Sequence, residues 1–406
     1  MDIDVLIVGL GPAGATVLSK LAQMVGSEYS ILGIDHRKKP GFPVQCGEFM
    51  PSPKEMAILM PNVPHALEFF TFEDKFISNS TNKISFFTPN GRMIQTPFEG
   101  FTLNRGKWNT HLVEMSIKNG AEVWTSACAQ GYINENRVIV SRKDSSNVEI
   151  IPKIIVGADG VNSRIAKWMG MSEKRSEDHY VIVKQHLMRN IKSELYDSDD
   201  VQMFFGEKYA PGAYSWIIPK DDKTANVGAG VRVSNLKRNM NVSKALANIT
   251  TIHPVSSQIL HGAQIEETIA GVVPVGLPFQ RTVDLTKNVI LVGDAACQVV
   301  SSVGAGIPTS MVAGTLAART IANYLSGIGS LDQYQVEWQK QMLPMFKSAY
   351  KLRRFFDAIS TGEDSRVQWY MNRLKSGDIK KVVHCSVPWK LSLGFPFITM
   401  LNRIIK

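Results

Sequence analysis

The first part of the chain combines short apolar runs with a helical repeat of apolar positions. Val5 to Val8 form an uninterrupted apolar run, which is typical of a strand buried on both faces of a parallel sheet. Apolar residues then recur at helical spacing from Ala15 to Ala22. A second apolar segment, Tyr29 to Asp35, predicts another strand. This order of strand, helix and strand predicts the beginning of a Rossmann-type α/β fold.

A glycine-rich turn separates the first predicted strand from the helix. The turn, Gly9 to Gly14, has the pattern G-x-G-x-x-G, whose glycines permit a tight turn, close approach of a pyrophosphate and close helix packing. Asp35 ends the next strand, where a carboxylate is well placed for ribose hydroxyls. This context predicts a dinucleotide site, but the motif alone does not separate NAD from FAD.

Two later segments repeat the pattern of an apolar strand followed by a glycine turn. Ile154 to Trp168 contains the turn around Asp159 and then a predicted helix. Val289 to Leu325 contains a turn with Asp294, a second glycine turn ending at Gly306, and a long predicted helix. Asp294 at a strand end can accept hydrogen bonds from a ribityl chain. Gly306 at a helix start offers backbone N–H groups to a pyrophosphate or a flavin ring.

In order and spacing, these three segments resemble those of the glutathione-reductase-like flavoproteins, and more narrowly the p-hydroxybenzoate-hydroxylase-like group. The resemblance covers roughly residues 1–330. It implies FAD as the cofactor, and it does not require a second nucleotide site.

Three shorter stretches resemble the geranylgeranyl reductase family. Val44 to Glu48 is similar to the family's cysteine-glycine-acid motif beside the flavin. Arg105 to Asn109 is similar to R-x-x-F-D, with Trp for Phe and Asn for Asp. Pro211 to Pro219 is similar to P-x-x-Y-x-W-x-F-P, with Ile218 in place of the last Phe. Asn226, Val227, Gly228 and Gly230 follow at the family's usual distance.

The resemblance assigns expected roles to individual residues. Cys46 is the tentative catalytic residue, near the flavin ring, although it could also be only a small apolar residue in a tight loop. The expected FAD contacts are Gly9, Gly11, Ala13, Gly14, Asp35, Cys46, Gly47, Arg105, Ala129, Asp159, Asp294, Gly304, Gly306 and Ile307.

The aromatic stretch carries the expected substrate contacts, which are Tyr214, Trp216 and Ile218. A spacing of two places all three side chains on one face of a strand. The resemblance implies that they line a long apolar cavity beside the flavin, where an isoprenoid chain can be buried. The alternative is that the rings only pack the sheet against a helix.

Phe49 and the segment Val300 to Val303 also depart from the family pattern. Phe49 stands where a glycine is common, and we expect it to narrow the mouth of the cavity. Val300 to Val303 stands where the family usually has proline before the second glycine turn. Because that loop borders the reactive face of the flavin, substrate preference is less firmly implied than FAD.

The order of the segments predicts a discontinuous architecture. The FAD-binding domain is expected over residues 1–70, 100–175 and 272–330. Residues 71–99 and 176–271 would form an interleaved α+β substrate domain, with a hairpin turn at Asn90-Gly91. Residues 331–406 read as a helical C-terminal region with breaks near Thr361-Gly362 and Val387-Pro388.

The excess of positive charge is concentrated near the C-terminus. Residues 341–406 hold 12 Lys and Arg against 4 Asp and Glu, whereas the other 340 residues hold 33 against 32. Aromatic residues accompany these cations in Lys351 to Phe356 and Trp389 to Lys406, a combination that suits peripheral contact with a membrane. A basic cap on the protein body explains the pattern equally well. No nucleic-acid-binding pattern accompanies it, so we expect no nucleic-acid partner.

Other features restrict the class of protein. The four cysteines are widely spaced and the eight histidines are scattered, so we expect a reduced, cytoplasmic protein without a metal site. We see no secretory signal and no apolar segment long enough to span a bilayer.

The sequence therefore favours an FAD-dependent reductase of geranylgeranyl chains, which the resemblance links to archaeal-type membrane glycerophospholipids. An isoprenoid lipid would be the substrate, and ferredoxin, NADPH or NADH remain open as electron donors. A flavin monooxygenase acting on an aromatic or polyprenyl substrate would share the fold and the FAD motifs. A non-catalytic carrier of prenylated cargo is the third hypothesis.

Overall fold

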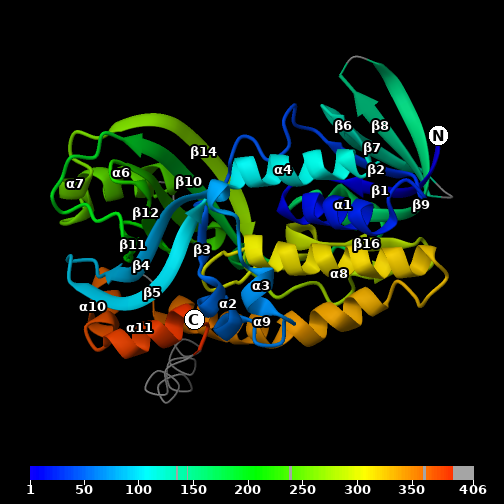
Figure 1. The fold of residues 1–406 in the computed structure, drawn as a ribbon. Coiled ribbons are helices and arrows are strands. Elements are labelled where there is room, and N and C mark those ends of the chain that lie inside the picture. Colours follow the sequence, from blue (N-terminus) through cyan, green and yellow to red (C-terminus); the bar gives the residue numbers. More distant parts are fainter. Residues whose placement is uncertain (134–135, 144, 237–239, 360–362, 387–406) are drawn as a thin grey trace.

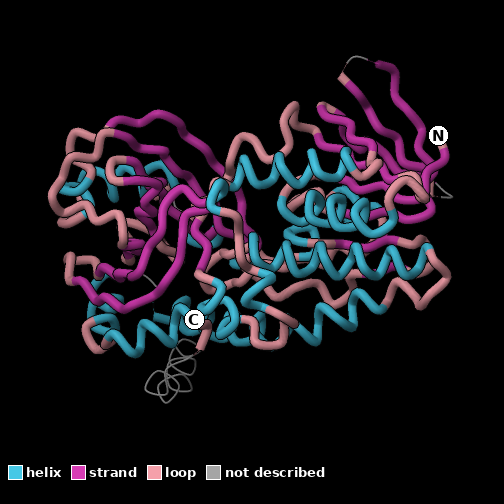
Figure 2. Tube along the Cα trace, viewed as in Figure 1, coloured by secondary structure: helices cyan, strands magenta, loops and turns pink. Residues whose placement is uncertain are grey.

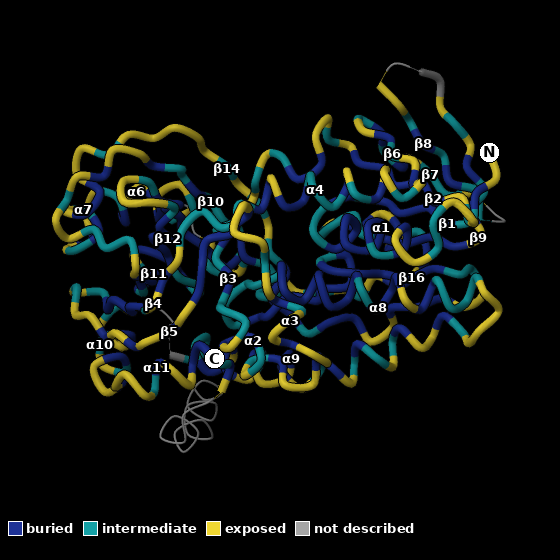
Figure 3. Tube along the Cα trace, viewed as in Figure 1, coloured by how far each residue is buried: buried dark blue, intermediate teal, exposed yellow. Residues whose placement is uncertain are grey.

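The computed structural model describes residues 1–133, 136–143, 145–236, 240–359 and 363–386. Two eight-stranded sheets lie side by side in it, and the chain passes between them several times (Figure 1). Most of the buried residues follow the central strands of both sheets and the helices packed on them (Figure 3).

The first sheet has the predicted parallel arrangement. Its central strands lie in the order β16, β9, β1, β2, β6, and all neighbours along this path are parallel. The strands of this sheet are β1 (Asp2–Val8), β2 (Ile31–Asp35), β6 (Glu122–Thr125), β7 (Ala127–Ile133), β8 (Arg137–Arg142), β9 (Ser145–Gly157), β15 (Val283–Asp284) and β16 (Val289–Leu291). The predicted strands around Val5, Ile34, Ile155 and Ile290 are thus confirmed.

Helices cover one face of this sheet, and β7, β8 and the start of β9 form an antiparallel extension that encloses the other face. The covering helices are α1 (Pro12–Val25), α4 (Arg105–Lys118) and α8 (Ile307–Leu325). α8 runs beside α1 because small residues meet there: a Cβ on Gly314 would lie 2.8 Å from Thr16 Cβ. This close approach places the starts of α1 and α8 at the same end of the sheet.

The second sheet is mixed, in the order β14, β10, β13, β12, β11, β4, β5, β3. The strands are β3 (Phe49–Pro51), β4 (Ile77–Phe87), β5 (Met93–Leu103), β10 (Tyr180–Arg189), β11 (Asp200–Phe204), β12 (Ser215–Asp221), β13 (Thr224–Arg232) and β14 (Gln264–Pro274). β4 and β5 form the hairpin predicted around Asn90-Gly91. The two helices α6 (Val242–Thr251) and α7 (Ser256–Ile259) pack on one face.

The C-terminal helices cover the other face of the second sheet. They are α9 (Gln333–Ile359), α10 (Asp364–Met371) and α11 (Ser376–Val383). Figure 2 shows α9 running below both sheets. Both predicted helix breaks, Thr361-Gly362 and Val387-Pro388, lie outside the described residues.

Several short helices complete the fold. They are α2 (Pro53–Leu59), α3 (Ala66–Phe69), α5 (Arg164–Trp168) and the 3-10 turns Asp74–Phe76, Glu177–His179, Val233–Asn235 and Gly293–Ala296. The predicted domain limits remain a prediction. β3 and the end of β5 lie within segments expected for the FAD-binding domain, yet they pair with each other in the second sheet.

The basic aromatic segment Lys351 to Phe356 is part of α9. Leu352, Arg353 and Phe355 are buried and Phe356 is half-buried, so its rings pack inward, as the cap alternative expects. Trp389 to Lys406 lies outside the described residues. Among the described helices, none combines the length and the apolar character that crossing a bilayer requires.

Gly314 provides a test of the contact between α1 and α8. We expect Gly314→Val to destabilise the protein by about 1–3 kcal/mol, because the added methyl groups would push α8 away from Thr16. FAD affinity should fall as well, since both helix starts would shift. Thermal unfolding and flavin fluorescence measure the two effects. Arg319→Ala, on the exposed face of α8, is the control. Equal stability of both variants would contradict this account.

Candidate active site

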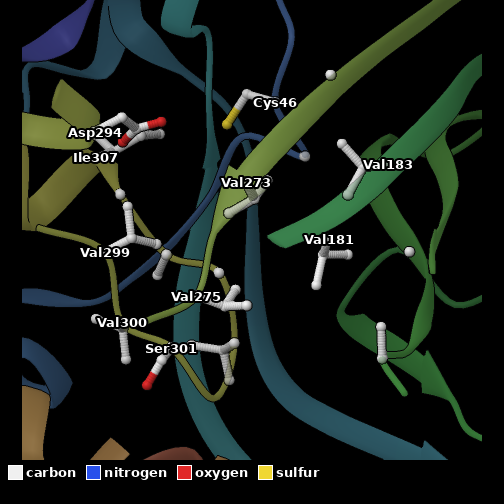
Figure 4. A pocket seen from close by; sticks show the side chains of 18 of the residues that line it. Cys46, Val181, Val183, Val273, Val275, Asp294, Val299, Val300, Ser301 and Ile307 are labelled. Carbon is white, nitrogen blue, oxygen red and sulfur yellow. The ribbon is translucent and has the colours of Figure 1, made fainter. Parts of the chain in front are cut away.

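A cavity of about 930 Å³ connects the two sheets. It is lined at one end by the glycine turns of the first sheet and at the other by the second sheet and α9 to α11. Figure 4 shows Asp294 and Ile307 on one side of the cavity, Val181 and Val183 on the other, and Cys46 and Val273 between them. Every residue predicted to contact the cofactor or the substrate lines this cavity except Gly14.

The first glycine turn leaves room for a phosphate. Gly9 has a φ of 91°, and a Cβ there would lie 2.5 Å from the carbonyl oxygen of Ala158. A Cβ on Gly14 would lie 1.9 Å from Gly9 O, so Gly14 serves helix packing rather than the cavity wall. Gly11 has no atom within 4 Å of where its Cβ would be. Gly11 thus borders open space at the start of α1, where helix N–H groups attract phosphate.

Asp35 holds the turn and faces the cavity. One carboxylate oxygen accepts the N–H of Leu10 at 2.8 Å, and the other accepts the N–H of Arg37 at 2.8 Å. Each oxygen retains a lone pair for a ribose hydroxyl. Asn109, which stands where the family motif has Asp, donates from Nδ2 to Leu10 O at 2.8 Å. The turn is therefore fixed from both sides.

Two opposite charges lie deeper in the cavity. Arg105 is buried, and its Nε has no hydrogen-bond partner among the described residues. Burial raises the pKa of the Asp294 carboxyl to about 6, and the Arg105 charge opposes this rise. No hydrogen bond to the Asp294 carboxylate occurs within the described chain. Both groups therefore have unused hydrogen-bonding capacity toward a ligand in the cavity.

The remaining predicted cofactor residues surround the same space. Gly304, Gly306 and Ile307 line the cavity at the start of α8, where no side chain caps the helix. Ala129 lines it from β7, and its carbonyl accepts Arg164 Nη1 at 2.8 Å. Asp159 also lines the cavity, but its carboxylate accepts the N–H of Arg164 at 2.7 Å at the start of α5.

The site therefore fits FAD. Open helix starts would hold the pyrophosphate, Asp35 the ribose, Asp294 the ribityl chain, and Gly306 with Ile307 the ring.

The segment Cys46-Gly47-Glu48, which we call the cysteine turn, connects the FAD end to the second sheet. The Cys46 thiol accepts the N–H of Glu48 at 3.2 Å, and burial raises its pKa, which keeps the thiol protonated. Glu48 is buried at a φ of 67°. Its carboxylate pairs with Lys220 and accepts Asn226 Nδ2 at 3.1 Å and the N–H of Arg105 at 3.0 Å.

The aromatic strand lines the cavity as predicted. Trp216 and Ile218 share one face of β12, whereas Ile217 packs into the core on the other face. Tyr214, directly before the strand, lines the same cavity and packs with them. The Tyr214 hydroxyl donates to Val303 O at 2.5 Å, and Trp216 Nε1 donates to Gln185 Oε1 at 3.0 Å. The two rings thus line the cavity and also connect to its neighbouring loops.

The C-terminal helices complete an apolar chamber opposite the aromatic strand. The apolar part of this chamber wall consists of Leu352, Phe355, Phe356, Val367, Tyr370, Met371, Leu374, Val382, Val383 and Cys385, and Arg353 and Asp357 also line the cavity from α9. Ile84, Phe86, Phe98, Val201 and Met203 face it from the second sheet. Phe49 also borders the cavity, and its ring lies 6.3 Å from that of Phe98.

Local sequence patterns do not point to several polar residues that hold the cysteine turn. Gln185, Lys220 and Asn226 come from three different strands, and only the pairing of those strands brings them together. Asn226 belongs to a motif in the sequence, but the motif does not indicate that it donates to Glu48. A buried polar residue within an apolar strand pattern is the signal that could have pointed to Gln185.

The fold and the site define an FAD-binding flavoprotein with an apolar chamber next to the flavin. The model of the geranylgeranyl reductase catalytic domain matches residues 179–272, most of the second sheet. Digeranylgeranylglycerophospholipid reductase 3 of Methanosphaera stadtmanae is 30% identical over 94% of this chain and 93% of its own. Digeranylgeranylglycerophospholipid reductase 2 of Methanopyrus kandleri is 29% identical over 97% and 98%.

The chain therefore belongs to the family of digeranylgeranylglycerophospholipid reductases, and the predicted resemblance to geranylgeranyl reductases is confirmed. A solved structure of a geranylgeranyl bacteriochlorophyll reductase-like protein from Thermoplasma acidophilum shares the fold. Its TM-score is 0.78 at 24% identity, over 92% of this chain and 93% of that one.

The raised pKa of Asp294 predicts pH-dependent FAD binding. An ionised carboxylate accepts a ribityl hydroxyl best, so affinity should weaken as the pH falls below about 6, by up to about tenfold per pH unit. Titration of the apoprotein with FAD between pH 5 and 8 measures this. Asp294→Asn should bind more weakly at pH 8 and lose the dependence. An unchanged slope in that variant would contradict the assignment.

Proposed function

We propose that this protein saturates C=C bonds of geranylgeranyl chains on archaeal-type membrane glycerophospholipids by hydride transfer from reduced FAD. One observation carries the proposal: an apolar chamber opens directly onto the residues that fit the flavin ring, within one continuous cavity. Family membership supports the same activity.

The chamber suits an isoprenoid chain because its walls are aliphatic and aromatic. Burial of a chain against them gains free energy in proportion to the apolar area removed from water, at about 25 cal/mol per Å². Trp216 and Ile218 face the chain on one side, and the helical wall around Met371 faces it on the other. The chain's double bonds can thus be aligned while water is excluded.

Reduced FAD, when bound, supplies the hydride for one carbon of the double bond. The other carbon needs a proton, and we propose that the Cys46 thiol delivers it. Burial keeps that thiol protonated, and the cysteine turn places it at the wall of the same cavity that Asp294 lines. Addition of one hydride and one proton saturates the bond, and solvent then restores the thiol proton.

The partners follow from the same chemistry. A reductant must restore reduced FAD in every cycle, and we propose ferredoxin, NADPH or NADH for this role. We also propose that the protein acts in the cytoplasm as a peripheral membrane enzyme, because its substrate lies in a bilayer and its C-terminal region is basic.

The first test supplies electrons chemically. Purified protein, reduced with dithionite without oxygen, should convert a geranylgeranyl phospholipid to products heavier by two hydrogens per saturated bond, as measured by mass spectrometry. An unchanged lipid beside flavin that stays reduced would contradict the proposal for this substrate. A hydroxylated product after oxygen is admitted would instead indicate a monooxygenase.

A variant of Cys46 tests proton delivery. Cys46→Ala should lower the rate of lipid reduction by about 10²-fold or more, because general acid catalysis contributes about 10²–10⁴-fold. FAD affinity should stay close to that of the wild type, since several other residues hold the cofactor. Single-turnover oxidation of prereduced flavin by the lipid measures the step. Cys297→Ala, at a buried cysteine that is not among the residues lining the cavity, is the matched control. An undiminished rate for Cys46→Ala would remove Cys46 from the mechanism.

A further inference from the structure

The cysteine turn follows the first sheet in the chain but is held mainly by the second sheet. Gln185 on β10 donates from Nε2 to the carbonyl oxygen of Cys46 at 3.1 Å. Asn226 on β13 donates from Nδ2 to the next carbonyl oxygen, that of Gly47, also at 3.1 Å. Two successive carbonyls of the turn are thus bound by side-chain amides of neighbouring strands.

Gln185 has a second partner. Its Oε1 accepts the indole N–H of Trp216 at 3.0 Å, so one amide joins the aromatic strand to the cysteine turn. Gln185 is 5% exposed and Trp216 is 9% exposed. Buried hydrogen bonds of this kind hold their groups in a fixed geometry, because breaking them leaves polar atoms without partners.

Packing at Gly47 supports the same connection independently. A Cβ on Gly47 would lie 2.8 Å from Ile218 Cδ1, 3.7 Å from Trp216 Nε1 and 3.8 Å from Gln185 Oε1. The turn therefore lies directly on the aromatic strand, with no space for a side chain between them. Movement of Gln185 would change the position of the thiol and of the chamber wall together.

We propose that Gln185 is a positioning residue, which fixes the Cys46 thiol relative to the Trp216 ring and so relative to the double bond. This inference rests on the proposed function for its effect on the reaction. The contact itself is independent of turnover. Glu48, paired with Lys220, anchors the end of the turn, whereas Gln185 acts at the carbonyl of the reacting residue itself.

The experiment compares Gln185→Met and Gln185→Glu with wild type. Methionine keeps the volume and removes both hydrogen bonds. Ionised glutamate keeps an acceptor for Trp216 but has no donor for Cys46 O, so the comparison is made at alkaline pH. Gln258→Leu, at an exposed residue of α7, is the control.

Thiol labelling measures how often the cysteine turn exposes Cys46, and it does not depend on catalysis. FAD-loaded protein is treated with N-ethylmaleimide, and mass spectrometry follows Cys46 relative to Cys128. We expect the relative rate to rise about tenfold in both Gln185 variants, because the turn opens more often without its hydrogen bonds. The control should match wild type. If Gln185→Met fails to fold, Gln185→Glu alone decides the outcome.

Kinetics with prereduced protein and geranylgeranyl phospholipid then test the role in the reaction. The kcat of the Gln185 variants should fall about 10–100-fold with KM changed less than about threefold, because misplacement affects the transition state more than binding. Labelling and kcat both within about twofold of wild type would overturn the inference. If the Gln185 variants show altered labelling but the wild-type protein reduces no lipid, the proposed function is overturned. The contact between Gln185 and the cysteine turn is then still established.

Discussion

The active site depends on the contacts made by the buried carboxylate of Glu48. It joins Lys220 and Asn226 of the second sheet to the N–H of Arg105 at the start of α4, which packs on the first sheet. A buried charge is stable only when it is paired and hydrogen-bonded, and here those partners come from both halves of the molecule. The need to satisfy one carboxylate therefore fixes the FAD end and the chamber relative to each other.

The two sheets have different roles, and this connection joins them. Parallel strands of the first sheet end at glycine turns, which leave room for a dinucleotide and supply helix N–H groups. The mixed second sheet packs one apolar face against α6 and α7 and turns the other toward the chamber, where α9 to α11 cover it without filling the space. The cysteine turn crosses from one sheet to the other, so the residue proposed to deliver the proton lies where cofactor and chain would meet.

Local patterns in the sequence predicted the first sheet well, because glycine turns and apolar strands are properties of contiguous segments. Gly11, Asp35 and Gly306 all lie where the pattern indicated. The same holds for Tyr214, directly before β12, and Trp216 within it, whose spacing of two places both rings at the cavity. Gln185 and Lys220 could not be found this way, because their roles depend on which strands become neighbours. The inward packing of Phe355 is likewise set by the placement of α9.

The chamber wall opposite the aromatic strand is built almost entirely from one continuous segment near the C-terminus, α9 to α11. The residues that fit FAD come from earlier parts of the chain. Substitutions in this single segment can therefore change the length or branching of the chain that the chamber accepts. The cofactor site is built from other residues and is under separate selection. Exchange of this segment between relatives would transfer the shape of the chamber as one unit.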